Sequence, residues 1–208
     1  MQETGTRINK YMSQCGYCSR READRLIEKG EVWINGTLAT MGTKVMPGDT
    51  VMVHHTTITP CQKEYLLAFH KPAGIVCTTS KIDKNNVIDY LNFPERIYPV
   101  GRLDKESTGL LLLTNNGQLM DDVLRGSNYH EKEYIVHVNK PITDSVLQAM
   151  AQGVPILDTI TRPCKIRRMG KDCFYITLTQ GLNRQIRRMC EYFDYKVVTL
   201  KRVRIMNL

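Results

Sequence analysis

The sequence predicts an α+β protein in which a small N-terminal module precedes a larger domain of alternating strands and helices. Apolar residues near the N-terminus recur at helical spacing, and Asn35-Gly36 between two short apolar segments marks a tight β-hairpin. In residues 174–179, apolar and polar side chains alternate as in a strand, and a helical pattern follows in residues 183–193. Both periodicities therefore occur within one chain of 208 residues.

Two short helices are predicted at the start of the chain. Residues 8–15 place apolar side chains at positions i, i+3, i+4 and i+7, which lie on one helix face. Ser19 and Glu22 form a capping box, in which the hydroxyl and the carboxylate satisfy free amides at the start of a helix. Apolar residues within 23–27 supply the buried face of this second helix, and Gly30 ends it.

Small strands follow these helices. Residues 32–34 and 37–39 flank the hairpin turn, and a Pro-Gly-Asp turn at 47–49 leads into a strand at 51–53. Residues 54–63 are irregular and contain three threonines and a proline, so we expect a flexible linker there.

The larger domain is expected to follow this linker, so the chain divides into residues 1–62 and residues 63–208. Thr143 and Asn183 are expected to cap the last two helices of this domain. Strands are predicted at 66–69, 75–77, 110–113, 132–138 and 174–179, with two extended pieces over 197–206, and helices at 87–91, 119–124, 143–150 and 183–193.

Residues 101–117 contain the most informative pattern, G-R-L-D-K-E-S-T-G-L-L-L-L-T-N-N-G. Its unbroken apolar run, 110–113, has the length of a strand and is best interpreted as a strand buried on both faces. Asp104 precedes this strand in a short polar segment bounded by glycines. A carboxylate held rigidly at the mouth of a buried strand suits a nucleophile or a general base. A turn aspartate that only bonds nearby backbone amides is the alternative.

The charge of the chain is unevenly distributed. The net charge is +8, and residues 162–208 alone carry twelve Lys/Arg against three Asp/Glu. This concentration indicates a surface that faces a polyanion, most simply nucleic acid, although a solvated basic face is the alternative. No apolar run is long enough to span a bilayer, and no secretion signal is recognised, so we expect a cytoplasmic protein without membrane contact.

The seven cysteines do not form a recognisable framework. An odd number in a chain of this size argues against disulfides and favours a reducing cytoplasm. Cys15 and Cys18 form a C-x-x-C pair, but structural zinc needs four ligands and no second C-x-x-C or H-x-x-x-H occurs. We interpret the two as packed thiols and predict no metal site.

The central pattern resembles the signature of the A-type pseudouridine synthases of the small ribosomal subunit, G-R-L-D followed by T-x-G-L-L-L-L-T-N-x-G. Asp104 matches the catalytic aspartate of that family. Tyr134, within K-E-Y, matches the active-site tyrosine of the K-x-Y motif, and an ordinary half-buried strand aromatic is the alternative. The run at 181–189 matches the third motif, in which Arg187 is the arginine expected to pair with the catalytic aspartate.

The same resemblance implies a mixed, largely antiparallel sheet with helices packed against it. Leu200 lies where the family has an apolar residue near the target base. Three short runs, K-E-Y-I-V, V-P-I-L and R-I-M-N, are similar to the branch named for the large ribosomal subunit. The arginines near the start of the helix at 183–193 suit a phosphate site, and they are predicted to lie outside its apolar stripe. The RNA contacts expected in the larger domain are Arg102, Lys132, Arg184 and Arg188.

The N-terminal module resembles the S4 RNA-binding domain in the order and spacing of its helices and hairpin. Its basic side chains are expected to contact phosphates, which position a protein on RNA without reading the sequence. Any one of them is alternatively a solvent-facing helix residue. The expected contacts are Arg7, Lys10, Arg20 and Arg21.

The resemblance implies conversion of a uridine in RNA to pseudouridine. The N1–C1′ bond is cut, the uracil turns, and C5 joins C1′. Asp104 would attack the ribose or act as a base on a glycal path, and the sequence does not choose between the two. Arg187 would hold Asp104 through a charge-assisted contact, Tyr134 would stack on the uracil and help remove the C5 proton, and Arg102 would fill the gap left by the flipped nucleotide. The reaction is redox-neutral, so no cofactor is expected.

The expected partner is RNA, with 23S rRNA as the first candidate and tRNA as a further one, and the protein is expected to act as a monomer. A non-catalytic ribosome assembly factor of the S4 type is the alternative. It would explain the N-terminal module and the basic C-terminal region equally well. It would not explain why Asp104, Tyr134 and Arg187 all occupy motif positions.

Overall fold

The computed structural model describes residues 5–61, 63–80, 82–125 and 129–208. Contacts divide the chain into two compact units. The N-terminal unit comprises Met1–Tyr65 with Pro94–Arg96 and Asn115–Gly117, and the larger unit comprises Leu66–Phe93, Ile97–Thr114 and Gln118–Leu208. Among the described residues, no helix is both long and apolar enough to cross a bilayer.

The part of the N-terminal unit that the structure describes contains two helices and six short strands. Ser19 Oγ accepts a hydrogen bond from Glu22 N at 3.1 Å, which confirms the predicted cap. Asn35 and Gly36 both have positive φ, as a two-residue hairpin turn requires. The elements are β1 (Thr6–Arg7), α1 (Ile8–Gln14), α2 (Arg20–Glu28), β2 (Val32–Ile34), β3 (Thr37–Leu38), β4 (Lys44–Val45), β5 (Val51–Val53) and β6 (Thr56–Ile58).

Strand pairing in this unit corrects one prediction. The main sheet has the order β3-β2-β5-β6, while β1 pairs with β4. Strand β6 lies within the predicted linker at 54–63 and pairs antiparallel with β5. Ile58 is buried there, so this part of the segment belongs to the folded unit because it extends the sheet and adds to its core.

Cys15 and Cys18 pack against the core that α1 and α2 form with the strands. Both thiols are free and half-buried, and burial raises the pKa of each to about 11. A thiol with so high a pKa carries little thiolate at neutral pH and reacts slowly. The pair is therefore part of the packing, as predicted.

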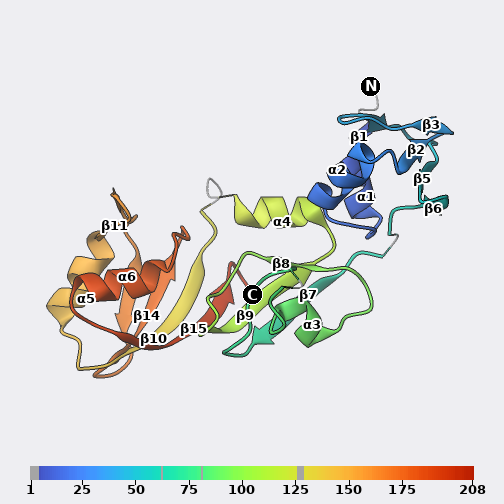
Figure 1. Ribbon diagram of the computed structural model, residues 1–208. Coiled ribbons are helices and arrows are strands. Elements are labelled where there is room, and N and C mark those ends of the chain that lie inside the picture. Colours follow the sequence, from blue (N-terminus) through green and yellow to red (C-terminus); the bar gives the residue numbers. More distant parts are fainter. Residues whose placement is uncertain (1–4, 62, 81, 126–128) are drawn as a thin grey trace. The chain divides into compact units, whose positions relative to one another are not determined.

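The described residues of the larger unit form four helices and nine strands, whose arrangement Figure 1 shows. They are β7 (Leu66–Lys71), α3 (Val87–Leu91), β8 (Tyr98–Val100), β9 (Thr108–Thr114), α4 (Gly117–Leu124, of which Gly117 is assigned to the N-terminal unit), β10 (Lys132–Val138), α5 (Asp144–Gln152), β11 (Pro155–Ile156), β12 (Thr159–Ile160), β13 (Lys165–Arg168), β14 (Cys173–Leu178), α6 (Gln185–Tyr192) and β15 (Val197–Ile205).

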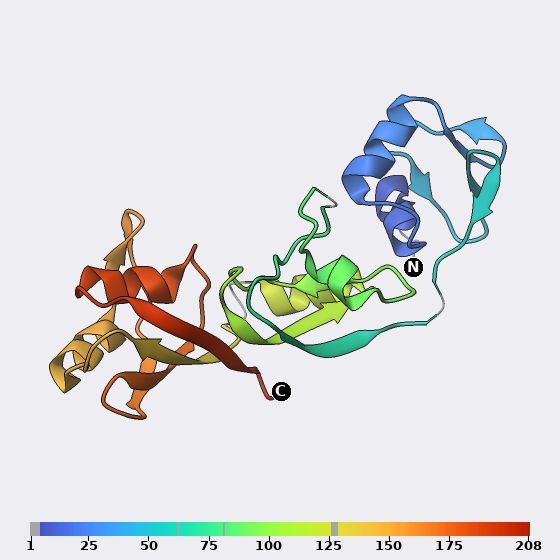
Figure 2. The same ribbon diagram turned by 60° about the horizontal axis from the view of Figure 1, so that its bottom comes forward.

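Seven of these strands form one mixed sheet in the order β13-β14-β10-β15-β9-β7, with β8 paired to β9. Every pair is antiparallel except β15 and β9, which run parallel. The predicted α+β class with a largely antiparallel sheet is confirmed. Figure 2 shows β15 running from the α6 side of the unit toward β9. The two extended pieces predicted over 197–206 are wrong, because the structure has a single strand that is long enough to pair with both β10 and β9.

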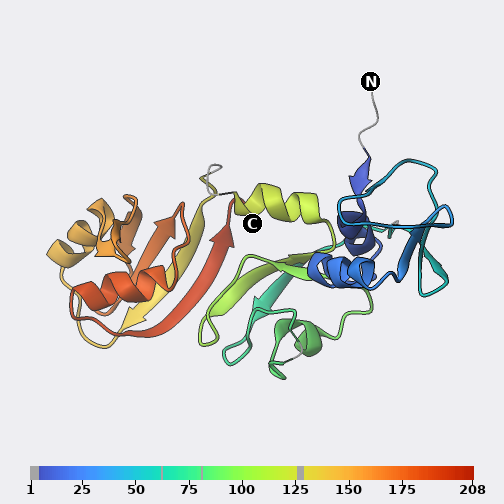
Figure 3. The ribbon, with the colours of Figure 1, turned by 45° about the horizontal axis from the view of Figure 1, so that its top comes forward.

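Helices α5 and α6 cover one half of this sheet (Figure 3). Their apolar residues, including Leu147 and Met189, share a core cluster with Val136 of β10, Phe174 of β14 and Leu200 of β15. Thr143 Oγ1 accepts from Val146 N at 3.3 Å and caps α5 as predicted.

Strand β9 is buried on both faces, as its apolar run predicted. Leu111 and Leu113 pack in the cluster that contains Val87 of α3, whereas Leu112 packs in the cluster that contains Val123 of α4. Complete burial of a leucine stabilises a fold by roughly 1.5–3 kcal/mol. Consecutive leucines with partners on both sides therefore fix the strand that follows Asp104.

Gly109 lies where β9 meets β15, opposite Arg202. Its φ of +102° is a conformation that favours glycine. A Cβ atom at this residue would overlap the carbonyl oxygen of Arg202 and come within 2.8 Å of the Arg202 nitrogen. Both atoms belong to backbone held by strand pairing, so no flexible side chain is available to move away. The parallel contact therefore requires glycine.

We expect Gly109→Ala to lower the free energy of unfolding by about 3 kcal/mol or more, because an unfavourable φ and a backbone overlap act together. Urea unfolding followed by circular dichroism measures the change. Gly170→Ala is the matched control, because an added Cβ would meet nothing closer than Cys173 Cβ at 3.8 Å. Equal unfolding midpoints for the two variants would contradict the steric argument.

Candidate active site

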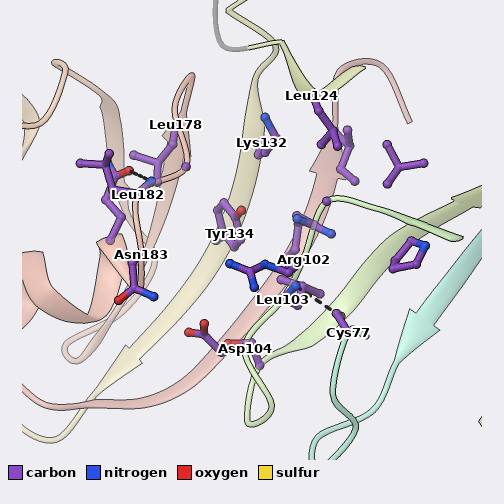
Figure 4. A pocket seen from close by; sticks show the side chains of 18 of the residues that line it. Cys77, Arg102, Leu103, Asp104, Leu124, Lys132, Tyr134, Leu178, Leu182 and Asn183 are labelled. Carbon is purple, nitrogen blue, oxygen red and sulfur yellow. Dashed lines mark hydrogen bonds between the residues drawn. The ribbon is translucent and has the colours of Figure 1, made fainter. Parts of the chain in front are cut away.

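A cleft of about 960 Å³ opens in the larger unit. Its walls come from segments that are distant in sequence. They include β8 with the loop 101–107 before β9, the segments 76–79 and 123–125, the start of β10, the segment 178–186 leading into α6, and β15. Figure 4 shows Arg102, Leu103 and Asp104 from the loop, Lys132 and Tyr134 from β10, and Leu182 and Asn183 from the segment before α6 around this cleft.

Asp104 and Arg187 form an ion pair at the cleft. Arg187 Nε lies 3.4 Å from Asp104 Oδ2, and Arg184 Nη1 lies 3.8 Å from the same oxygen. The Arg187 side chain is 10% exposed and the Asp104 side chain 29%. The carboxylate is therefore partly open to the cleft, while the Arg187 guanidinium is largely buried behind it. Arg187 was predicted to lie outside the buried stripe of its helix, and this is wrong because Asp104 compensates its charge inside the fold.

Arg187 also contacts two other segments. Its Nη2 donates to Ser107 Oγ at 3.3 Å and its Nη1 donates to Val197 O at 3.4 Å. The side chain thereby connects α6 with the loop that carries Asp104 and with β15. Removing one partner of a buried ion pair typically costs about 3–5 kcal/mol, because the other charge remains without compensation. The geometry of the carboxylate thus depends on the packing of α6.

Lys71 also holds the loop that carries Asp104. Its side chain is fully buried at the end of β7, and its Nζ donates to Pro72 O at 2.7 Å, Lys105 O at 3.1 Å and Ser107 O at 2.8 Å. Burial lowers the pKa of Lys71 from its ordinary value. Two of the three carbonyls belong to the turn that begins at Asp104, where Ser107 N donates to Asp104 O at 3.0 Å. A buried ammonium group therefore fixes this turn.

Two more contacts fix the loop. Gly74 N donates to Lys105 O at 2.8 Å, and Leu103 N donates to Cys77 Sγ at 3.4 Å. No role was predicted for Lys71, Ser107 or Cys77. The signal that points to Lys71 is its position at the end of a strand directly before proline. The other two residues act through contacts that no local pattern encodes.

Tyr134 and Leu200, two residues predicted for the site, both line the cleft. Tyr134 is half-buried on β10 and packs against apolar clusters on both sides. Leu200 is almost completely buried on β15, so it forms part of the cleft wall and of the core at once. An aromatic ring and an aliphatic side chain near a carboxylate suit the binding of a flat, weakly polar base.

The three arginines at 184–188 do not form one phosphate site. Arg187 is buried, whereas Arg188 donates from Nε to Asn183 O at 3.1 Å and from Nη2 to Asn183 Oδ1 at 3.2 Å. Asn183 therefore holds Arg188 and does not cap α6, so the predicted cap is wrong. Arg184 occupies the N-cap position with φ 49° and makes no side-chain capping bond. Of the three, Arg184 and Arg188 retain access to solvent.

The other predicted RNA contacts lie on the surfaces of their own units. Arg102 is exposed at the cleft and Lys132 is half-buried in its wall. In the N-terminal unit, the four basic residues predicted to contact phosphates form no ion pair with any described residue. Arg7, Arg20 and Arg21 are exposed and Lys10 is half-buried.

Sequence and structure comparisons find known proteins similar to this chain. The model of the RNA pseudouridylate synthase family matches residues 65–192, and the model of the S4 domain matches residues 6–51. The dual-specificity RNA pseudouridine synthase RluF of Salmonella typhi is 53% identical over 208 residues, which cover 99% of this chain and 72% of the relative. The ribosomal large subunit pseudouridine synthase B of Bacillus subtilis is 33% identical, with coverages of 94% and 84%. A crystal structure of a pseudouridylate synthase has a TM-score of 0.69 at 26% identity and covers 98% of this chain and 90% of its own.

We expect Lys71→Met to lower the free energy of unfolding by roughly 3 kcal/mol, because three carbonyls, of which Ser107 O is buried, lose their shared donor. Chemical denaturation at neutral pH measures this loss. Lys105→Met removes the same charge from an exposed neighbour and is expected to change stability by less than about 0.5 kcal/mol. A Lys71 variant as stable as the Lys105 variant would show that the ammonium group does not hold the turn.

Proposed function

Because this chain belongs to the RNA pseudouridylate synthase family, we propose that it isomerises a specific uridine in RNA to pseudouridine in the cleft of the larger unit. One observation carries the proposal: the Asp104 carboxylate is partly open to the cleft while Arg187 backs it from the interior. A binding factor without activity has no need for such a pair. A cleft of about 960 Å³ is also within the range that accommodates a nucleotide.

Asp104 is the residue that acts on the ribose. Either it attacks C1′ as a nucleophile or it removes a proton as the base of a glycal path, and both steps use a negatively charged carboxylate. Arg187 attracts that charge and fixes its direction, while Lys71 fixes the backbone that carries it. The reaction breaks N1–C1′, forms C5–C1′, and moves one proton from C5 to N1. No electron acceptor or hydrolytic water enters the balance.

Tyr134 and Leu200 hold the uracil while it turns. Tyr134 stacks on the ring and helps to remove the C5 proton, and Leu200 supplies an apolar wall. The base has to leave its stack first, which costs a few kcal/mol. Arg102, exposed at the edge of the cleft, fills the position that the flipped nucleotide leaves.

The remaining basic residues position the RNA. We assign residues 1–62 to an RNA-binding domain with its linker and residues 63–208 to the catalytic domain. Arg184, Arg188 and Lys132 contact phosphates at the cleft. The exposed basic side chains of the N-terminal unit contact phosphates farther from the target, at Arg7, Lys10, Arg20 and Arg21.

The target is a uridine of 23S rRNA. The name of the Bacillus subtilis relative states the large ribosomal subunit, and short runs of this chain resemble another branch named for the same subunit. The Salmonella typhi relative is named as having dual specificity, which supports a second RNA substrate here, with tRNA as the candidate. We place the enzyme in the cytoplasm as a monomer that needs no cofactor.

Asp104→Asn is expected to reduce pseudouridine formation at least about 1000-fold, because the cleft loses its reacting carboxylate. RNA affinity should be retained, because the phosphate contacts come from other residues. Pseudouridine mapping and filter binding on a 23S rRNA transcript measure the two quantities. Glu106→Gln, an exposed carboxylate two residues away, is the matched control with wild-type turnover. Strong pseudouridine formation by the Asp104→Asn variant would refute the assignment.

Arg187→Met and Arg188→Ala should separate two roles. The first should lower turnover at saturating RNA by about 100-fold or more with little change in affinity, because Asp104 loses its partner. The second should keep turnover and reduce the log–log salt slope of binding by about 0.7 to 0.9, the effect of one lost phosphate contact. Single-turnover kinetics and binding at several salt concentrations measure both. If both variants lost affinity alike and turned over normally, Arg187 would be another phosphate contact.

A further inference from the structure

Arg202 is a buried cation in the cleft wall that lacks a full set of acceptors. It lies on β15, is 3% exposed, and lines the cleft. Its Nε donates to Leu110 O at 2.6 Å. Its Nη2 is shielded from solvent and has no acceptor among the described residues. A guanidinium has five N–H donors, and a buried donor without an acceptor is unfavourable until an acceptor binds.

Lys132 places a second cation beside it. Tyr134 pairs directly with Arg202 across the strands, and Lys132 lies two residues before Tyr134 and lines the same cleft. Lys132 Nζ donates to His130 O at 3.3 Å. Burial lowers the pKa of Lys132, and the charge of Arg202 lowers it further.

No carboxylate of the cleft compensates these charges. Among the described residues that line it, Asp104 is the only acid, and its carboxylate already faces Arg187 and Arg184. Two neighbouring cations without an anion form a site for an anion from outside the chain. A guanidinium binds phosphate oxygens bidentately, and an ammonium adds a point charge.

We propose that Arg202 and Lys132 form a phosphate subsite that binds an RNA phosphate next to the target uridine. The inference rests on the proposed function, because it takes RNA as the ligand of the cleft. The phosphate supplies the acceptor that Arg202 lacks and neutralises Lys132. Since Tyr134 pairs with Arg202 and lies two residues from Lys132 on β10, anchoring the backbone here places the base of the same nucleotide against the tyrosine ring.

Nη2 is covered in the free protein, so the contact forms as the nucleotide enters and neighbouring side chains shift. The subsite should therefore contribute to the single-turnover rate at low RNA concentration more than to the first encounter with RNA. This expectation separates Arg202 from exposed arginines such as Arg184, which meet phosphates at once.

The test begins with pseudouridine mapping on a 23S rRNA transcript, followed by a short RNA that carries the mapped uridine. Neutral methylphosphonate linkages replace the phosphates on either side of that uridine, one at a time. We expect one replacement to slow the wild-type protein at least about tenfold. On normal RNA, the Arg202→Met variant should react more slowly than the wild type by a similar factor. The modified linkage should slow this variant no further.

Lys132→Gln is the second variant, because Lys132 is only half-buried and its replacement carries less risk for folding. It should show the same loss of sensitivity to the modified linkage. Lys201→Gln, an exposed cation next to Arg202 on β15 that does not line the cleft, is the matched control and should respond as the wild type does. If the methylphosphonate linkage slowed both Arg202→Met and Lys132→Gln by the same factor by which it slows the wild type, the subsite proposal would be wrong.

The two proposals fail in different ways. If the wild-type protein forms no pseudouridine, the proposed function fails, and filter binding of the same transcript still tests the subsite. In that case Lys132→Gln, but not Lys201→Gln, should lower the log–log salt slope by about 0.7. If pseudouridine forms and neither methylphosphonate nor the cleft variants change the rate, the function stands and the subsite is wrong.

Discussion

The ion pair between Asp104 and Arg187 joins positions 83 residues apart, and the arrangement of the larger unit depends on it. Arg187 sits on the buried face of α6 because Asp104 and Ser107 meet it there. Without those partners, α6 would carry an uncompensated charge into the core. Burial of the Arg187 charge requires Asp104 beside it, so the packing of α6 and the position of the Asp104 carboxylate depend on each other.

The loop that carries Asp104 is held at three levels. Lys71 donates hydrogen bonds to two carbonyls of the loop, and the two-sided burial of β9 fixes the C-terminal end of the loop. Gly109 lets β15 approach that end more closely than any other residue would. A carboxylate on a loop is ordinarily mobile, and these contacts explain how the chain keeps this one in place.

Local chemistry made much of this fold predictable. Ser19 and Thr143 cap their helices and Asn35-Gly36 forms its turn as expected, because caps and tight turns depend on neighbours in sequence. The double burial of β9 followed from an unbroken apolar run. Asp104 and Tyr134 were found through motif positions, and the cleft brings both to one surface. The burial of Arg187 was missed, because helical periodicity treats arginine as a surface residue.

The remaining misses have two physical origins. Lys71 acts on carbonyls more than thirty residues away, which no local pattern encodes. Asn183 and β6 instead have partners close in sequence, because Asn183 accepts from Arg188 five residues later and β6 pairs with the adjacent strand β5. Motif positions therefore supplied the candidate catalytic groups, whereas the groups that hold them in place become visible only in three dimensions.

The place of β15 in the sheet has a consequence for synthesis on the ribosome. This strand follows all others of the sheet in sequence, yet it lies between β10 and β9. Until it emerges, the nascent chain holds two half-sheets, each with an open edge where β15 belongs. Such edges pair readily with other chains, so the interval before the last strand inserts is when aggregation competes most strongly with folding. The cleft itself closes only at that final step.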